Sequence, residues 1–245
     1  MSELIFYDLK QSASMAPSLG TQVARELGRR IVAGTYEPGD LVEDETALAE
    51  RYQVSRSVVR DAVKILVGKG LLEVRRGIGT RVRPRLQWGL LDDDVLAWHQ
   101  SAPLNPDFLR QLMEFRAVFE PKAARWAAEL ATDDDIAEIR DAQARMEAEK
   151  GSVERFIIAD AEFHRAVLRA AHNQFLMALD GVIFSALLIS IRLTNEDPRE
   201  NEGSIPFHRD VYQAIAARDA DQAETLMGGL LADARFRLGE KLQRS

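Results

Sequence analysis

Two histidines and one aspartate lie on helix faces that the sequence predicts to be buried. Asp160 and His164 are one helical turn apart in the stretch ADAEFHRAVL. The apolar residues around them recur at intervals of three and four, which predicts one buried helical face: Phe156, Ile157, Phe163, Val167, Leu168 and Ala171. His208 shares a similar stripe with Val211, Tyr212 and Ile215. Burying a charge is costly unless a partner compensates it.

Two imidazoles and a carboxylate are a plausible ligand set for a divalent transition metal. The sequence therefore predicts a metal site at Asp160, His164 and His208, with Zn²⁺ as the expected ion. Coordination would replace the hydration that burial removes. Taken singly, each histidine is better explained as a hydrogen-bonded polar group of the core.

Two arginines also lie on apolar stripes of predicted helices. Arg116 follows Leu109, Leu112 and Met113, and Arg237 follows Leu230 and Ala234. A guanidinium that faces a cavity is suited to a carboxylate ligand, so we expect Arg116 and Arg237 to bind a small carboxylate effector. The alternative for Arg116 is a pair with Glu120, four residues further on.

The charge of the chain is distributed unevenly. The formal net charge is −7, but residues 51–85 carry ten cations and two anions, which is +8 and leaves −15 for the rest. A local basic patch on an acidic chain indicates a nucleic-acid-binding module joined to a second part. A basic face that is merely solvated is the alternative.

The elements that would position these cations have the order of a winged helix-turn-helix. Helical periodicity begins near Leu19, a short helix is expected over 45–52 after the N-cap Asp44, and Ser55 is expected to cap a helix over 56–68. A hairpin with a glycine-rich turn follows. The second helix of such a pair enters the major groove with its N-terminal residues leading. The predicted DNA contacts are Ser55, Arg56, Ser57 and Arg60 on this helix and Arg75, Arg76 and Arg81 on the wing. An ordinary helical domain with surface arginines is the alternative.

The rest of the chain shows only helical periodicity. We expect a flexible tail at 1–17, the DNA-binding domain at 18–84, a linker with a short helix at 85–105 and a helical bundle at 106–240. The bundle helices are predicted over 106–129, 133–150, 152–171, 174–194, 204–217 and 220–240, with a capping box at Thr132 and Asp135 and an N-cap at Asp219. The predicted fold class is mainly α.

Composition excludes several classes of protein. The chain has no cysteine, which excludes disulfides, thiolate metal sites and a cysteine nucleophile. No basic region followed by an apolar run begins the chain, so no signal peptide is expected. The most apolar segment, 175–191, is interrupted by Asp180 and Gly181 and is short for a membrane span. We expect a cytoplasmic protein without membrane contact.

The first half resembles the GntR family of bacterial transcription regulators. The resemblance rests on the runs VSRSVVRDAVKIL and GLLEVRRGIGT, within about 65 similar residues. It implies a winged helix with Ser55, Arg56 and Arg60 at operator DNA. One departure is Thr46, which stands where the family often has an arginine that touches phosphate.

The second half resembles the ligand-sensing FCD domain of the FadR-type branch of that family. The similar runs are MEFRAVFEPKAARWAAELAT, ADAEFHRAVLRAAHNQFL and HRDVYQAIAARDADQAETLM. The resemblance implies a helical bundle that binds a small carboxylate, often through a divalent metal, and Asp160, His164 and His208 match three of the usual ligands. The usual fourth ligand is a histidine, and Leu230 occupies its position. RLQWGLLDDDVLAW and VLRAAHN also resemble repressors of galactonate and related sugar-acid catabolism.

Together these features predict a homodimeric repressor whose affinity for operator DNA is set by a sugar acid such as an aldonate. Two alternatives remain. The helical half of a DNA-binding protein can serve only for dimerisation, with a structural polar cluster. An enzyme is the other, because two histidines and a carboxylate also describe iron oxygenase sites. Those sites usually lie on β-barrels, which the predicted elements do not form. A metal-dependent hydrolase would need a general base near the metal, and Glu162 does not supply one because it lies off the face that carries Asp160 and His164.

Overall fold

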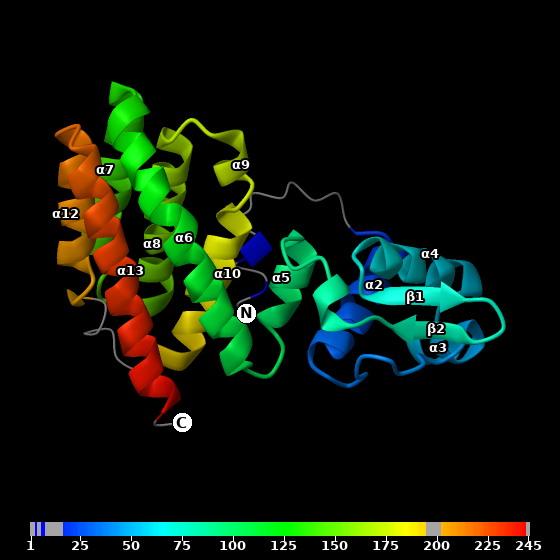
Figure 1. The fold of residues 1–245 in the computed structure, drawn as a ribbon. Coiled ribbons are helices and arrows are strands. Elements are labelled where there is room, and N and C mark those ends of the chain that lie inside the picture. Colours follow the sequence, from blue (N-terminus) through cyan, green and yellow to red (C-terminus); the bar gives the residue numbers. More distant parts are fainter. Residues whose placement is uncertain (1–2, 4–5, 8–16, 195–201, 244–245) are drawn as a thin grey trace. The chain divides into compact units, whose positions relative to one another are not determined.

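The chain folds into two compact units, Met1–Leu104 and Asn105–Ser245 (Figure 1). The structure is a computed structural model that describes residues 3, 6–7, 17–194 and 202–243. Within these residues the fold is helical apart from one two-stranded sheet. The predicted class, mainly α with an N-terminal winged helix and a C-terminal helical bundle, is confirmed.

The first unit has the element order of a winged helix-turn-helix. Its elements are α2 (Leu19–Val32), α3 (Glu45–Tyr52), α4 (Arg56–Gly68), β1 (Leu72–Arg75), β2 (Gly79–Val82), the 3₁₀ turn η1 (Arg85–Gln87) and α5 (Asp93–His99). The predicted caps explain where two helices begin. The Asp44 carboxylate accepts bonds from the first amides of α3, and the Ser55 hydroxyl accepts one from the Val58 amide at the start of α4.

The core of this unit lies between its helices and the sheet. It is made of aliphatic side chains with essentially no exposure, among them Leu27, Ile31, Leu48, Val59, Leu66 and Leu72. The strands β1 and β2 are antiparallel, with Leu72 opposite Val82 and Arg75 opposite Gly79. Gly77 and Gly79 have φ values of +77° and +117° in the connecting turn, a conformation that favours glycine. The wing therefore projects its arginines from a small, well-packed base.

Residues 85–104 pack on the first unit instead of forming a free linker. The Trp98 side chain of α5 is 1% exposed and lies so close to Gly28 of α2 that a Cβ at residue 28 would overlap its ring. Lys69 pairs with Asp92 and Asp94, each at 2.7 Å. The short helix that the sequence predicts is therefore anchored by an aromatic ring and two ion pairs.

The predicted tail at 1–17 lies mostly outside the described residues. Three of its described residues are in contact with the first unit. Glu3 and Phe6 are buried, the Arg29 Nε donates to Glu3 at 2.7 Å, and the Tyr7 hydroxyl donates to Asp94 at 2.6 Å. The ion pair between Glu3 and Arg29 of α2 helps to keep these residues packed on the first unit.

The second unit is a bundle in which α6 and α13 run antiparallel. Its helices are α6 (Pro106–Leu130), α7 (Asp133–Ala148), α8 (Val153–Ala170), α9 (Gln174–Met177), α10 (Asp180–Thr194), α12 (Ile205–Ala216) and α13 (Ala220–Leu242). The capping box of Thr132 and Asp135 is present, and Asp219 caps α13. The α6 and α13 helices contact each other along their lengths, and α8, α10 and α12 pack against them (Figure 1).

One of the predicted helices is divided into two helices in the structure. The expected span 174–194 is interrupted at Ala178 and Leu179, which separate α9 from α10. The Leu179 and Val182 amides bond to carbonyls three residues back instead of four, so the chain tightens into a turn there. In the part of the chain that the structure describes, no helix combines the length and apolar character needed to cross a membrane.

Candidate metal and effector site, and candidate DNA interface

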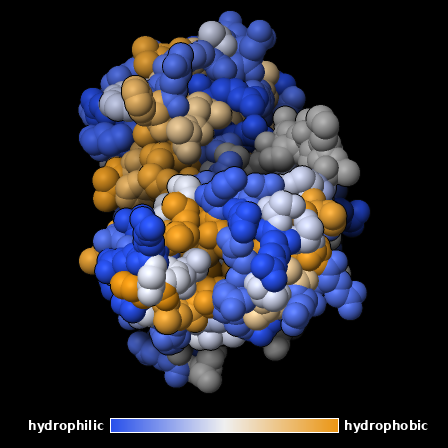
Figure 2. Space-filling model, turned by 90° about the vertical axis from the view of Figure 1, so that its right-hand side faces the viewer, coloured by the Kyte–Doolittle hydropathy of each residue, from blue (hydrophilic) through white to orange (hydrophobic). Residues whose placement is uncertain are grey.

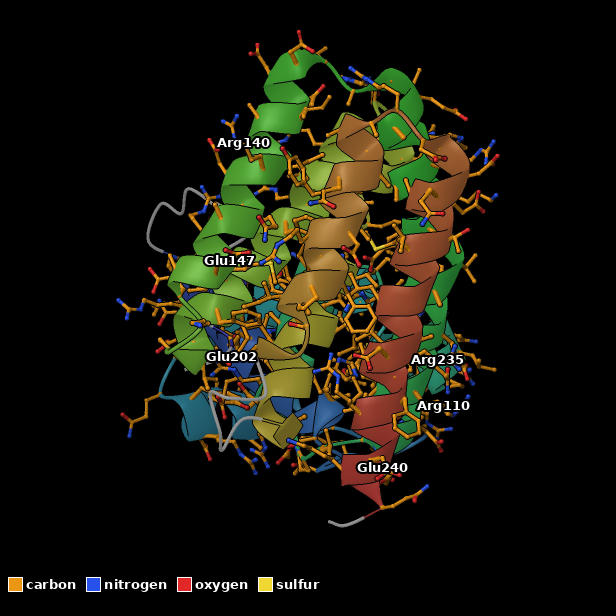
Figure 3. The ribbon with its side chains drawn as sticks, turned by 90° about the vertical axis from the view of Figure 1, so that its left-hand side faces the viewer. Arg110, Arg140, Glu147, Glu202, Arg235 and Glu240 are labelled. Carbon is orange, nitrogen blue, oxygen red and sulfur yellow. The ribbon has the colours of Figure 1, made fainter. Side chains whose placement is uncertain are left out.

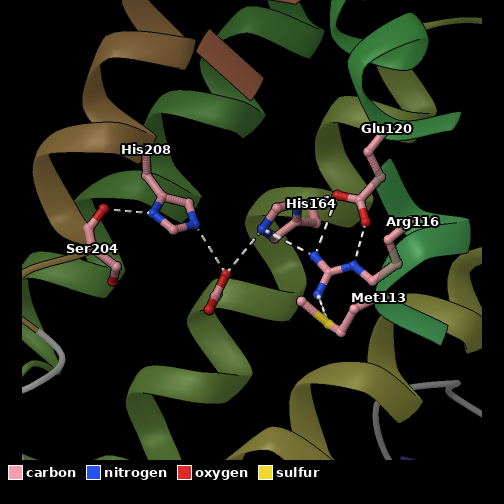
Figure 4. Close-up of polar contacts among 7 residues, drawn as sticks. Met113, Arg116, Glu120, His164, Ser204 and His208 are labelled. Atoms are coloured by element: carbon pink, nitrogen blue, oxygen red, sulfur yellow. Dashed lines mark hydrogen bonds and ion pairs between the residues drawn. The ribbon is translucent and has the colours of Figure 1, made fainter. Parts of the chain in front are cut away.

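Asp160, His164 and His208 meet in the interior of the second unit. Asp160 and His164 come from α8 and His208 from α12. The Asp160 Oδ1 lies 3.2 Å from the His164 Nε2 and 3.1 Å from the His208 Nε2 (Figure 4). One ligand atom from each residue lies within 4.8 Å of the others, and the two imidazoles are 2–3% exposed. The helix periodicity thus placed the three side chains on faces that meet.

The outer nitrogen of each imidazole is held by an acceptor. The His208 Nδ1 lies 2.8 Å from the Ser204 carbonyl oxygen, to which it donates, and the His164 Nδ1 lies 2.5 Å from the Glu120 Oε2 (Figure 4). An acceptor at Nδ1 fixes the tautomer that presents the lone pair of Nε2, as in most histidine metal sites. Both Nε2 atoms therefore face Asp160, and each can ligate a cation once it carries no proton.

Arg116 belongs to this buried network, and it pairs with Glu120. Its Nε and Nη2 donate to the two oxygens of Glu120, and its Nη2 is 3.5 Å from the His164 Nε2. Arg116 and Glu120 side chains are each 2% exposed. The i, i+4 pairing expected as the alternative is thus present, and it leaves the guanidinium beside the histidine cluster.

Arg237 does not join the cluster in this structure. Its Nε donates to Asp233 at 2.8 Å, one turn earlier on α13, and its side chain is 40% exposed. Leu238, the next residue, is the buried one at this end of α13. The apolar stripe that suggested an inward Arg237 is therefore rotated away from it.

Opposing charges compensate the burial of the network. Burial raises the pKa of Glu120, but the charges of Arg116 and His164 outweigh it and lower that pKa to about 2. Burial likewise raises the pKa of Asp160, and His208 and His164 bring it well below its usual range. Burial lowers the pKa of His164, but Glu120 and Asp160 outweigh this effect and raise it. Without a metal, a proton on His164 balances the second carboxylate.

The donor set fits a divalent metal. Asp160 supplies an oxygen and the two histidines supply nitrogens, which are ligands that zinc accepts. The network holds one permanent cation, Arg116, and two carboxylates, Glu120 and Asp160. With the proton on His164 its formal charge is 0, and a divalent ion that displaced this proton would bring it to +1. Among the residues that the structure describes, no fourth acidic or histidine ligand completes the group. A metal held by these three residues would keep coordination positions for water or an anionic ligand.

The predicted DNA contacts on α4 are exposed at its N-terminal end. Ser55, Arg56, Ser57 and Arg60 are all exposed, and the Ser55 and Ser57 hydroxyl oxygens are 2.8 Å apart. The Nε of Arg60 donates to both oxygens of Glu45 on α3, at 2.8 and 3.0 Å. The pair fixes the direction of one guanidinium. Figure 2 shows the side of the molecule that lies at the right in Figure 1, where hydrophilic side chains are mixed with apolar ones.

The three wing arginines differ in their surroundings. Arg75 is exposed and its Nε pairs with Glu73 at 2.9 Å. Arg76 is exposed in the turn between the strands. Arg81 lies on β2 directly opposite Glu73, and its side chain is partly buried. Arg75 and Arg76 are thus available to DNA phosphates, whereas Arg81 lies closer to the base of the wing.

Both units match known families. Residues 19–82 match the family "Bacterial regulatory proteins, gntR family", and residues 111–233 match the FCD domain. The galactonate operon transcriptional repressor of Escherichia coli is 36% identical over 216 residues, which cover 87% of this chain and 94% of that protein. The chain therefore belongs to the GntR family, in the branch that carries an FCD domain.

Other relatives and solved structures agree. The regulator LutR of Bacillus subtilis is 32% identical over 79% of this chain and 89% of its own length, and the Uxu operon transcriptional regulator of Escherichia coli is 29% identical over 94% and 90%. The structure of Lar from Listeria monocytogenes covers 93% of this chain and 99% of that one, with a TM-score of 0.66 at 19% identity, which supports the fold. The families that match are DNA-binding transcription regulators and not enzymes.

Sequence reasoning did not assign two partners of the site. The sequence predicts Glu120 only as a partner of Arg116, although it also contacts His164, and it does not indicate the contact of His208 with the Ser204 carbonyl. The position of Glu120 one turn after Arg116 was the available signal. The Ser204 contact, four residues before His208, follows from the helix repeat alone.

Proposed function

We propose that this GntR regulator is a repressor of a sugar-acid catabolic operon, and that a carboxylate effector in the FCD bundle sets its affinity for operator DNA. The effector is proposed to bind a divalent metal, most simply Zn²⁺, held by Asp160, His164 and His208. A galactonate operon repressor is among the similar proteins, so aldonates are the first class of effector to test.

The observation that carries this proposal is the arrangement of the two imidazoles. Both present Nε2 to the Asp160 carboxylate, and both have Nδ1 held from outside by an acceptor. Such outer partners orient metal-ligating histidines and increase their basicity.

The charge of the site favours an anionic effector. With a divalent ion the group becomes net positive, and Arg116 lies beside it with its Nη2 3.5 Å from the His164 Nε2. A carboxylate that occupies the open positions of the metal would therefore also meet a guanidinium. Arg237 is proposed as a second contact, which requires it to exchange Asp233 for the effector.

At the other unit, Ser55, Arg56, Ser57 and Arg60 are proposed to read the major groove, with Arg75, Arg76 and Arg81 on flanking phosphates or the minor groove. Helix-turn-helix proteins usually bind two half-sites as dimers, so we propose a homodimer that acts on the chromosome in the cytoplasm. Effector binding then favours one of two states that differ in DNA affinity.

A second candidate is a regulator whose bundle only dimerises. Arg116, Glu120, His164, Asp160 and His208 form a continuous chain of polar contacts, so the cluster can be satisfied without a ligand. This candidate predicts that neither a metal nor a sugar acid changes stability or DNA binding.

Thermal unfolding with added metal, chelator and a panel of aldonates and uronates separates the two candidates. A ligand at 100 times its dissociation constant should stabilise the protein by about 2.7 kcal/mol, which is several degrees for a bundle of this size. His208→Gln should abolish the metal response. His172→Gln is the matched control, because His172 is exposed and pairs only with Asp135 among described contacts. Equal responses from both variants would refute the proposed site.

A further inference from the structure

The helix α4 carries two exposed arginines one turn apart, and they differ in their partners. The Arg56 side chain has no hydrogen bond or ion pair with any residue that the structure describes. Arg60 pairs with Glu45, the first residue of α3, whose two carboxylate oxygens accept from the Arg60 Nε at 2.8 and 3.0 Å. The direction of Arg60 is therefore fixed from a second helix, whereas Arg56 is free to turn.

The pair with Glu45 leaves the end of the Arg60 guanidinium open. Among the described residues, neither Nη nitrogen of Arg60 has a hydrogen-bond partner. The pair on the wing is different, because Arg75 uses both its Nε and its Nη2 to bind the two oxygens of Glu73, at 2.9 and 3.3 Å. Two parallel N–H donors of an arginine fork match O6 and N7 of guanine. Arg60 thus keeps such a fork available.

Stability does not account for the position of Glu45. The side chains of Arg60 and Glu45 are 60% and 43% exposed, and ion pairs with this exposure contribute little to folding. Similar exposed pairs occur on the second unit, for example at Glu147, which Figure 3 labels among other charged side chains of that surface. The start of α3 is already capped by Asp44. Glu45 differs from the other carboxylates because it holds a residue of the proposed DNA interface.

A carboxylate at this place has opposite effects on affinity and on specificity. Phosphates repel it, so Glu45 weakens the attraction of this surface to DNA of any sequence. It also offsets the charge of Arg60, so the pair gains little from a phosphate. A guanine can still accept from both Nη nitrogens, whereas adenine presents an amino donor in place of O6. Such a pair disfavours the wrong sequences more than the right one.

We propose that Glu45 is a positioning residue for operator recognition. It holds Arg60 so that the two Nη nitrogens meet O6 and N7 of a guanine, and it suppresses contacts of Arg60 with phosphates. The inference rests on the proposed function, which places Arg60 in the major groove. Because Arg60 is ordered before DNA arrives, less of the binding free energy is lost in ordering its side chain.

The test measures DNA binding by variants of the full chain in fluorescence anisotropy. The probes are an operator selected in vitro, the same duplex with each base pair replaced in turn, and a random duplex of equal length. Arg60→Ala identifies the base pair that Arg60 reads, which should be G·C. Glu45→Gln should reduce discrimination at this base pair by at least about fivefold, the lower end for a bidentate arginine contact.

The random duplex gives a second readout that a merely structural role would not change. Glu45→Gln should bind it more tightly than the wild type does, because Arg60 is released to a phosphate. The slope of log affinity against log salt concentration should then become steeper by up to about 0.9. Glu50→Gln is the matched control, because Glu50 is exposed on the same helix and pairs with no arginine among the described residues. It should leave discrimination unchanged.

Glu45→Asp separates the position of the carboxylate from its charge. It keeps a negative charge at the start of α3 but shortens the reach by one methylene, about 1.5 Å. It should lose discrimination as Glu45→Gln does, whereas its salt dependence should stay close to that of the wild type. Circular dichroism verifies that each variant retains its helices.

A double variant completes the test. In a chain that carries Arg60→Ala, Glu45→Gln should cause no further loss of discrimination, because the side chain that it positions is absent. The proposal is overturned if Glu45→Gln or Glu45→Asp discriminates as the wild type does, or if the effect of Glu45→Gln persists unchanged in the double variant. If Arg60→Ala itself leaves discrimination intact, the proposed contact of Arg60 is wrong and this inference fails with it.

Discussion

Replacing Glu120 by glutamine tests the buried network directly. The substitution keeps the size of the side chain and removes its charge, which leaves Arg116 without its carboxylate partner. Because the pKa of Glu120 falls from 4.5 to about 2 in the folded protein, the charged form is favoured by about 3 kcal/mol at 1.36 kcal/mol per pKa unit. A buried arginine that loses its partner costs a similar 3–5 kcal/mol.

We therefore expect Glu120→Gln to lower the free energy of unfolding of the bundle by about 3 kcal/mol at pH 7. The melting temperature should fall by roughly 10 °C. A carboxyl whose pKa is depressed on folding stabilises fully above its unfolded pKa, and this contribution is lost progressively as the pH falls from 4.5 through about 2. Neutral pH is thus the correct condition, and urea unfolding followed by circular dichroism is the assay.

Two controls make the result decisive. Glu162→Gln removes a carboxylate from α8 whose pair with Arg145 is exposed, so it should cost at most about 1 kcal/mol. Combining Glu120→Gln with Arg116→Met should cost less than the sum of the single changes, because both buried charges are then absent. If Glu120→Gln is no more destabilising than Glu162→Gln, the network does not hold the bundle together and the reasoning is wrong.

Three further predictions concern the first unit. Gly28→Ala should destabilise the first unit by about 1–3 kcal/mol in chemical denaturation, because the new methyl group overlaps the Trp98 ring. Gly68→Ala is the control, and it should be neutral or stabilising because there is open space around that residue. Burial lowers the pKa of His99 to about 4, so the free energy of unfolding should be highest above pH 6.5 and should decrease by at most about 3 kcal/mol as the pH falls from 6.5 toward 4. His99→Gln should flatten this dependence on pH. An unchanged slope would exclude His99 as its cause. Arg60→Ala should weaken binding to an operator selected in vitro by about 1–3 kcal/mol in fluorescence anisotropy and relax specificity at one base pair, and a uniform loss over all sequences would instead indicate a phosphate contact.

Local signals in the sequence predicted most helix boundaries. Asp44, Ser55 and Asp219 each cap the helix that they were expected to begin, because a cap is a contact between neighbours in the chain. The break between α9 and α10 had no such signal. The residues at the break are Ala178 and Leu179, and neither is a helix-breaking glycine or proline. The helix is interrupted there by a turn whose hydrogen bonds span three residues.

The same distinction applies to the site. Asp160 and His164 are four residues apart, so helix periodicity alone put them on one buried face. The contact between His164 and Glu120 joins α8 to α6 and depends on how two helices pack, which periodicity does not reveal. The apolar residues before Arg237 predicted that its side chain points into the bundle. The packing of α13 buries the neighbouring Leu238 instead.

The contacts of the outer nitrogens of His164 with Glu120 and of His208 with the Ser204 carbonyl have a consequence for when the protein can fold. Every member of the polar cluster already has a partner from another turn or another helix, so the bundle can mature without waiting for an ion. This differs from small zinc domains, which are unfolded until the metal binds. If the proposed metal site is correct, newly made chains would fold first and could bind and release the metal without refolding. Under the proposed function, scarcity of metal would then abolish the response to the effector and leave the number of regulator molecules unchanged.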